Sequence, residues 1–204
     1  MPREQHATAP VILDPNTAGY ISLSDCLTKM EFCDDGPELP ENPERFHRSE
    51  CVLGSEGFNS GTHCWDVVVD LCIGPWSVGL KAESSSRDGP DSNWQGFWGI
   101  HYVGYMDDSA CEHGKYQARS PGASPIPLKV NQRPRRIRVQ LDWDRGELSI
   151  TDLENNTRLY TFTHAFTERM FPCFMADCCT LRIVSWRIVG KGQDLTWTLC
   201  PSSL

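Results

Sequence analysis

Apolar and polar residues alternate along much of this chain. Between residues 64 and 70, Trp65, Val67 and Val69 fall on one side and Cys64, Asp66, Val68 and Asp70 on the other. Between residues 136 and 141, Ile137, Val139 and Leu141 alternate with Arg136, Arg138 and Gln140. A period of two is typical of a half-buried β-strand, so both segments are predicted to be strands. The two arginines are then expected on the solvent face.

The same reasoning predicts an all-β chain. Further strands are expected at residues 20–25, 29–33, 76–80, 97–103, 147–151, 158–162 and 180–189. Asp144-Arg145-Gly146 and Glu154-Asn155-Asn156 supply turn residues for two hairpins. Residues 121–127 contain three prolines and are expected to be non-regular, and residues 163–169 are expected to form a helical turn. Short strands joined by tight turns favour an antiparallel two-sheet β-sandwich.

Composition narrows the possible partners. The chain has 204 residues and a net charge of −8, which argues against nucleic acid because binding phosphates requires a concentrated basic face. No apolar run is long enough to cross a membrane. The 10 cysteines include no C-x-x-C pair, so neither a metal nor another cofactor is expected. Residues 1–10 lack the apolar core of a secretory signal, which predicts a cytoplasmic protein with reduced thiols.

Three motifs carry a family resemblance. Residues 42–46 read NPERF, and residues 52–67 read VLGSEGFNSGTHCWDV. Together they resemble the junction between the PRY and SPRY segments of tripartite-motif and butyrophilin proteins. Leu13-Asp14-Pro15 and Leu141-Asp142-Trp143-Asp144 match two further family signatures in the right order. The resemblance implies a bent antiparallel β-sandwich of the PRY-SPRY type with short helical turns.

The resemblance also divides the chain. Residues 1–10 would be a leader or linker remnant, 11–60 the PRY segment, 61–189 the SPRY segment and 190–204 a C-terminal tail. Glu56 and Asp66 are tempting as paired carboxylates. In the family, however, these positions look structural, and the resemblance implies that they tie turns through backbone hydrogen bonds.

Nothing in the sequence indicates catalysis. The six histidines are scattered, and neither a Gly-x-Ser-x-Gly elbow nor a phosphate-binding loop is present. A binding module is therefore expected rather than an enzyme. By the resemblance, ubiquitin ligase activity would lie in a RING domain outside this chain. A hydrolase with a Cys/His pair is the catalytic alternative, and it predicts one cysteine of depressed pKa.

Sandwiches of this kind recognise partners through loops at one end. The resemblance places these loops at about residues 34–48, 82–93, 101–115 and 175–180. Aromatic and amphipathic side chains carry most interface energy. The candidate partner-binding residues are therefore His101, Tyr102, Val103, Tyr105, Met175, Asp177 and Cys178. Because residues 101–103 lie in an alternating strand, at least one of them is expected in the core. Some antibody-binding relatives have tryptophans where this chain has His101 and Val103, so that ligand is not carried over.

The leading hypothesis is a protein-interaction module. It would recognise a substrate or pathogen protein for a tripartite-motif-like ubiquitin ligase in innate immunity, and the isolated domain would be a monomer. The same module in a leucine-rich-repeat immune receptor, a butyrophilin or a toxin subunit is an alternative. A sandwich that binds a small ligand or sugar is another. The sequence upstream of Met1 and a ligand-induced rise in thermal stability would separate these readings.

Overall fold

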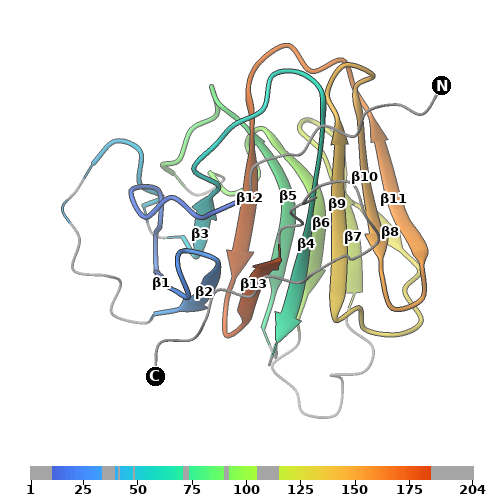
Figure 1. Ribbon diagram of the computed structural model, residues 1–204, viewed down its shortest axis with the longest axis horizontal. Coiled ribbons are helices and arrows are strands. Elements are labelled where there is room, and N and C mark those ends of the chain that lie inside the picture. Colours follow the sequence, from blue (N-terminus) through green and yellow to red (C-terminus); the bar gives the residue numbers. More distant parts are fainter. Residues whose placement is uncertain are drawn as a thin grey trace, which may run out of the picture.

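The computed structural model describes residues 11–33, 40, 42–47, 49–70, 74–89, 92–104 and 115–184. Within these residues the chain forms strands and turns and no helix (Figure 1). The strands are β1 (Ile21–Ser24), β2 (Lys29–Phe32), β3 (Cys51–Leu53), β4 (Thr62–Asp70), β5 (Trp76–Ala82), β6 (Phe97–Val103), β7 (Lys115–Arg119), β8 (Ile126–Leu128), β9 (Arg136–Asp142), β10 (Glu147–Asp152), β11 (Thr157–Thr163), β12 (Met170–Ala176) and β13 (Thr180–Val184).

Two antiparallel sheets form the sandwich. The seven-stranded sheet has the order β1-β2-β13-β4-β9-β10-β11, and the six-stranded sheet has the order β3-β12-β5-β6-β7-β8. Figure 1 shows the N-terminal strands β1 and β2 at one side of the molecule and the β10–β11 hairpin at the other. The N-terminal segment therefore extends both sheets, because β3 pairs with β12 in the second one. The predicted all-β antiparallel sandwich is confirmed.

The core lies between the sheets. Trp65 on β4 and Trp76 on β5 are both 0% exposed and belong to one continuous apolar cluster that includes Val67, Val139 and Ile100. Each of these residues sits at an inward position of an alternating strand. Burying large aromatic and branched side chains is the main favourable contribution to folding, so the period-two pattern determines which face is interior.

Four strands, β3, β7, β8 and β12, fall where the sequence predicts none, and two of them contain a proline. β12 lies inside its sheet, between β3 and β5, although it contains Pro172. The carbonyl of Pro172 accepts a hydrogen bond from the Gly54 N–H at 2.8 Å, on the side where β3 has already ended. The missing proline N–H faces that same side, so no ladder bond to β5 is lost. β8 is a three-residue edge strand, where Pro127 is tolerated in the same way.

The helical turn expected over residues 163–169 is a wrong prediction. Residues 164–169 are irregular, and the start of the segment is tied to the β9–β10 turn of the same sheet by a bond from the His164 N–H to the Gly146 carbonyl at 2.8 Å. Gly146 has a φ of 65°, and a Cβ there would lie 2.1 Å from the His164 carbonyl oxygen. The close approach of two turns replaces local helical bonds in this segment.

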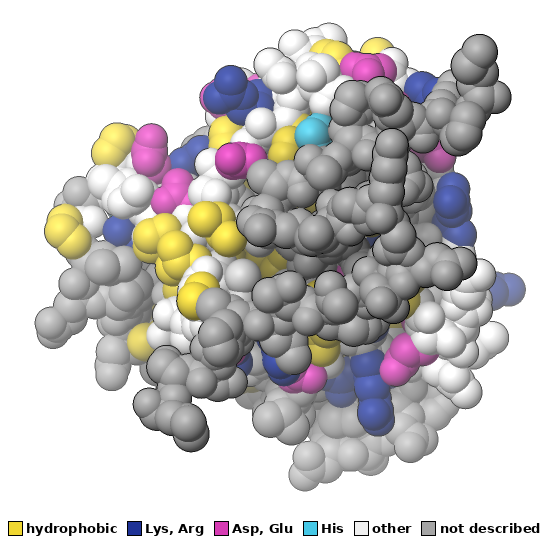
Figure 2. Space-filling model, viewed as in Figure 1, with side chains coloured by type: hydrophobic (Ala, Val, Ile, Leu, Met, Phe, Trp, Pro, Cys, Tyr) yellow, Lys and Arg dark blue, Asp and Glu magenta, His cyan; other side chains and the backbone are white. Residues whose placement is uncertain are grey.

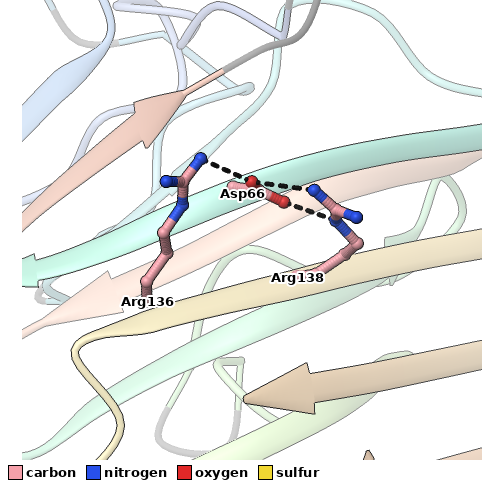
Figure 3. A network of polar contacts seen from close by, with 3 residues as sticks. All are labelled: Asp66, Arg136 and Arg138. Atoms are coloured by element: carbon pink, nitrogen blue, oxygen red, sulfur yellow. Dashed lines mark hydrogen bonds and ion pairs between the residues drawn. The ribbon is translucent and has the colours of Figure 1, made fainter. Parts of the chain in front are cut away.

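The outward face of the seven-stranded sheet carries an ion-pair network. Asp66 on β4 is 0% exposed and accepts hydrogen bonds from Arg136 at 2.8 Å and from Arg138 at 2.7 Å and 3.1 Å (Figure 3). The arginines lie on the outward face, as expected. Asp66 bonds their side chains, whereas the resemblance implied backbone bonds. Where Figure 2 shows described side chains, acidic and basic ones lie interspersed.

Candidate partner-binding site

The outward face of the six-stranded sheet brings together residues that are far apart in sequence. The strand registers pair Met175 with Ser77, Ser77 with His101, and His101 with Gln117. These four residues form one row across β12, β5, β6 and β7, because paired residues on neighbouring strands share a face. Cys51 on β3 extends the row at the other end. Two predicted residues, Met175 and His101, thus lie on either side of Ser77.

His101 is anchored within this row. Its Nδ1 shares a hydrogen bond of 2.9 Å with the Ser77 hydroxyl, and the residue is only 6% exposed. Burial, and to a lesser extent the positive charge of Arg119, lowers the pKa of His101 to about 4. The imidazole is therefore neutral at pH 7 and contributes hydrogen-bonding capacity and ring surface, without a charge.

Trp94 covers the same part of the sheet. Its ring meets the His101 ring edge-on at a centroid distance of 4.8 Å. The Arg119 guanidinium carbon lies 4.0 Å from the Trp94 ring centroid, which is a close cation–π stack. Arg119 pairs in register with Gly99, two positions before His101 on β6. Trp94, His101 and Arg119 form a connected aromatic and cationic surface.

The loop that carries Trp94 is held by a buried lysine. Lys81 on β5 is 0% exposed, and its Nζ donates hydrogen bonds to the backbone carbonyls of Ser92, at 2.6 Å, and Gln95. The ammonium also lies 5.7 Å from the centroid of the Phe46 ring. Burial lowers the pKa of Lys81. These bonds compensate the removal of the charge from water and fix both ends of the Trp94 turn on the sheet.

Asn93 ties the same turn to β12. Its side-chain amide donates to the Met175 sulfur at 3.8 Å, and its carbonyl oxygen accepts from the Ser49 hydroxyl and from the Cys51 thiol at 3.4 Å. Desolvation raises the pKa of Cys51, and it raises the pKa of Cys173 on the adjacent strand to about 11. A catalytic thiol needs the opposite shift, so these buried cysteines do not fit the hydrolase alternative.

The other predicted residues divide between the two faces of the sheet. Val103 is half-buried on the outward face, two positions beyond His101, and Asp177 is half-buried just past the end of β12. Tyr102 points the other way and is 2% exposed. It packs between Trp76 and Tyr116 at ring distances of 5.8 Å and 4.9 Å. Tyr102 is therefore the core member of the 101–103 segment. Tyr105 lies outside the described residues.

Cys178 is exposed and takes a φ of 52° at the turn between β12 and β13. The next residue, Cys179, is buried and disulfide-bonded. The expectation of fully reduced thiols is therefore wrong at Cys179. Six other cysteines among the residues that the structure describes are not disulfide-bonded.

Four residues of this surface were not predicted as site residues: Ser77, Lys81, Trp94 and Arg119. Trp94 carried a signal, because a tryptophan in a stretch rich in Ser, Asp, Gly and Pro falls outside any alternating strand. Ser77, Lys81 and Arg119 carried none. Each looks like an ordinary polar position of a strand until the sheet register places it beside the others.

The described residues also form two open clefts. One, of about 480 Å³, is lined mainly by polar residues of the loop after β3 and by Arg87, Arg169 and Phe171. The other, of about 680 Å³, lies beside Trp98, His164 and Phe166. Among the described residues, no group of three or more His, Cys, Asp or Glu side chains is placed to hold a metal ion. The described part of the chain also contains no helix long and apolar enough to span a membrane.

Comparisons with known proteins agree with this architecture. Residues 62–185 match the SPRY domain, and residues 11–58 match PRY, the SPRY-associated domain. The solved structure of stonustoxin superposes on 90% of this chain with a TM-score of 0.70, at 25% identity over 31% of that chain. The TRIM65 PSpry domain superposes on 90% with a TM-score of 0.66, at 20% identity over 98% of that chain, which supports the fold.

Curated relatives match at the sequence level. Nuclear factor 7, ovary, of Xenopus laevis is 36% identical over 167 residues, which cover 80% of this chain and 25% of that protein. The E3 ubiquitin-protein ligase TRIM35 of Homo sapiens is 35% identical over 170 residues, covering 79% and 32%. Butyrophilin subfamily 1 member A1 of Bos taurus is 32% identical over 173 residues, covering 83% and 31%. The chain thus spans about a quarter to a third of these relatives.

The SPRY match covers more than half of the chain, so the chain belongs to the SPRY domain family, with a PRY segment preceding the SPRY domain. It is homologous to the domains found in tripartite-motif ubiquitin ligases and butyrophilins. Its activity as a domain is protein–protein binding.

Proposed function

We propose that this chain is the target-recognition domain of a tripartite-motif-like E3 ubiquitin ligase that acts in cytoplasmic innate immunity. The ligase relatives support this proposal, because the chain corresponds to about a third of TRIM35, TRIM58 and TRIM69 and leaves the remainder of such proteins for other functions. In this proposal the ligase activity resides in a RING domain outside the chain, and the isolated domain is a monomer.

The partner binds the outward face of the six-stranded sheet. One observation carries this assignment: Met175, Ser77 and His101 lie in one row, with half-buried Val103 and Asp177 continuing the same face beyond it. Met175, Ser77 and His101 are themselves buried and form the rigid floor of the site, and half-buried Val103 and Asp177 offer an aliphatic group and a carboxylate beside it. Mixed apolar and polar groups on a rigid scaffold are what a specific protein interface requires.

Site-specific photo-cross-linking tests this assignment. A photoreactive amino acid replaces Val103 in one version of the chain. In the control version it replaces Gln140, which is exposed on the outward face of the seven-stranded sheet. After irradiation in cell lysate, the version labelled at position 103 should capture a protein that the control does not. Equal capture by both, or capture at position 140 alone, would refute the proposed site.

A receptor or a toxin subunit is the alternative to a ligase as the parent protein of this domain. The similarity to a butyrophilin and to stonustoxin supports the same module in a receptor or toxin subunit. The gene sequence upstream of Met1 tests this point. Zinc-binding motifs and heptads there support the ligase, whereas a transmembrane segment or leucine repeats support a receptor. Localisation is tested with a fluorescent fusion, and cytoplasmic fluorescence is the expected result.

A further inference from the structure

The described arginines meet their partners in two different ways. Arg136 and Arg138 share the carboxylate of Asp66, and Arg182 meets Asp70 at 2.6 Å. Arg119, on the proposed partner-binding face, has no carboxylate partner among the residues that the structure describes. Desolvation lowers the pKa of Arg119, and the guanidinium group keeps its charge at pH 7. A half-buried positive charge therefore lies on the binding face, and none of the described residues supplies a carboxylate counter-ion to it.

The guanidinium group is also fixed in place. The Trp94 ring lies 4.0 Å from its central carbon, and its Nη2 donates to the Gln117 side-chain oxygen at 3.2 Å. An arginine has five N–H donors in a rigid fork that matches both oxygens of a carboxylate. Because stacking and hydrogen bonding already restrict Arg119, binding an anion would cost little further side-chain entropy.

Two described residues of this face, His101 and Asp177, do not neutralise the charge of Arg119. His101 is neutral at pH 7 because its pKa is near 4. Asp177 follows β12, three strands away from β7 in the sheet order, which is roughly 14 Å at the usual strand spacing. That distance is beyond ion pairing with Arg119.

The net charge of the chain limits which anions fit. At −8 overall, the domain repels a run of acidic residues. A segment with a single carboxylate flanked by apolar side chains avoids this repulsion. Its apolar side chains then pack on Val103 and Trp94. We infer that the partner of this domain presents an extended segment in which one internal Asp or Glu side chain binds Arg119 beside Trp94. This inference rests on the proposed function and specifies the chemistry of the partner.

Peptide selection on the immobilised chain tests the inference. The library holds random 12-residue peptides between fixed linkers, so both termini are blocked. Selected peptides should share one Asp or Glu at a fixed position, flanked by apolar residues. Changing that acid to its amide should weaken binding to the wild type at least tenfold.

Variants of the chain identify the contact. Arg119→Gln should bind the acidic peptide at least tenfold more weakly than the wild type, and it should no longer distinguish the acid from the amide. Arg135→Gln removes an equal charge from an exposed position outside this face and should change affinity less than twofold. Circular dichroism and the thermal midpoint establish that each variant is folded.

Each remaining outcome contradicts a defined part of the account. If the selected peptides lack a common acid, or if Arg119→Gln still prefers the acid, the inference fails. If these peptides nevertheless lose binding to Val103→Asp, the proposed site still stands. If Val103→Asp binds them as well as the wild type does, or if no peptide is selected, both the site and the inference fail.

Discussion

The outward faces of the two sheets treat positive charge differently. On the seven-stranded sheet, Arg136 and Arg138 meet the buried carboxylate of Asp66, so the charges are neutralised within the fold. On the six-stranded sheet, Lys81 is bound by backbone carbonyls and Arg119 by the Trp94 ring. Neither carbonyls nor an aromatic face cancels a full charge. The outward face of the seven-stranded sheet is therefore organised for stability, whereas that of the six-stranded sheet retains the capacity to bind an anion.

The largest expected effect concerns Asp66. Asp66→Asn leaves two arginines without their shared carboxylate and should lower the free energy of unfolding by about 3 kcal/mol. Asp70→Asn is the matched control, because Asp70 is 37% exposed and pairs with Arg182 in contact with solvent. That change should cost less than about 1 kcal/mol. Urea denaturation measures both, and equal losses would contradict the contrast between a buried network and a surface pair.

The second effect is a pH dependence caused by His101. Its pKa is about 4 in the folded chain, below the ordinary value of 6.5, so the unfolded chain binds the proton more readily. The contribution of neutral His101 to the free energy of unfolding is fully present above pH 6.5 and decreases as the pH falls toward 4. The contribution of His101 should drop by about 2 kcal/mol between pH 7.5 and pH 5.

His101→Gln removes this titration and keeps a group that can bond Ser77. Denaturant unfolding of both proteins across this pH range measures the difference. Parallel curves for the wild type and the variant would show that His101 titrates normally in the folded chain.

Lys81 should produce a smaller loss. Lys81→Met keeps the aliphatic stem but leaves the Ser92 and Gln95 carbonyls without their donor, at a cost of about 1 to 2 kcal/mol. Hydrogen exchange should accelerate selectively at residues 92–96, because that turn loses its attachment. Unchanged exchange there would show that Lys81 does not hold the Trp94 turn.

The smallest expected stability effect is that of Arg119. Arg119→Gln removes a stack on Trp94 and should lower the free energy of unfolding by less than about 1 kcal/mol. Its main effect is on binding. A stability loss as large as that of Asp66→Asn would instead assign Arg119 a structural role equal to that of the ion-pair network.

Much of the fold was predictable, because one face of most strands is buried. The aromatic stretch at residues 97–103 predicted the bounds of β6, and the hairpin of β9 and β10 followed from alternation and turn residues. β12 was not predictable, because it is a nearly continuous apolar run that contains Pro172. Only the end of β3 beside it explains why a proline is tolerated there.

The binding face was only partly predictable. His101 and Met175 were identified by resemblance, and period-two reasoning required one core residue near them, which is Tyr102. Ser77 and Arg119 depend on the registers of β5 with β6 and of β6 with β7. An alternating sequence pattern predicts which face of the sheet a side chain lies on. It does not predict which residue of the neighbouring strand lies opposite.

The most direct test of the central claim compares the two faces with one partner. The protein captured at position 103 is purified, and its affinity is measured by calorimetry for the wild type, Val103→Asp and Gln140→Asp. Both variants add the same charge at a strand position on an outward face. The account predicts at least tenfold weaker binding for Val103→Asp and no change for Gln140→Asp. Equal affinities of the two variants, or a loss confined to Gln140→Asp, would contradict it.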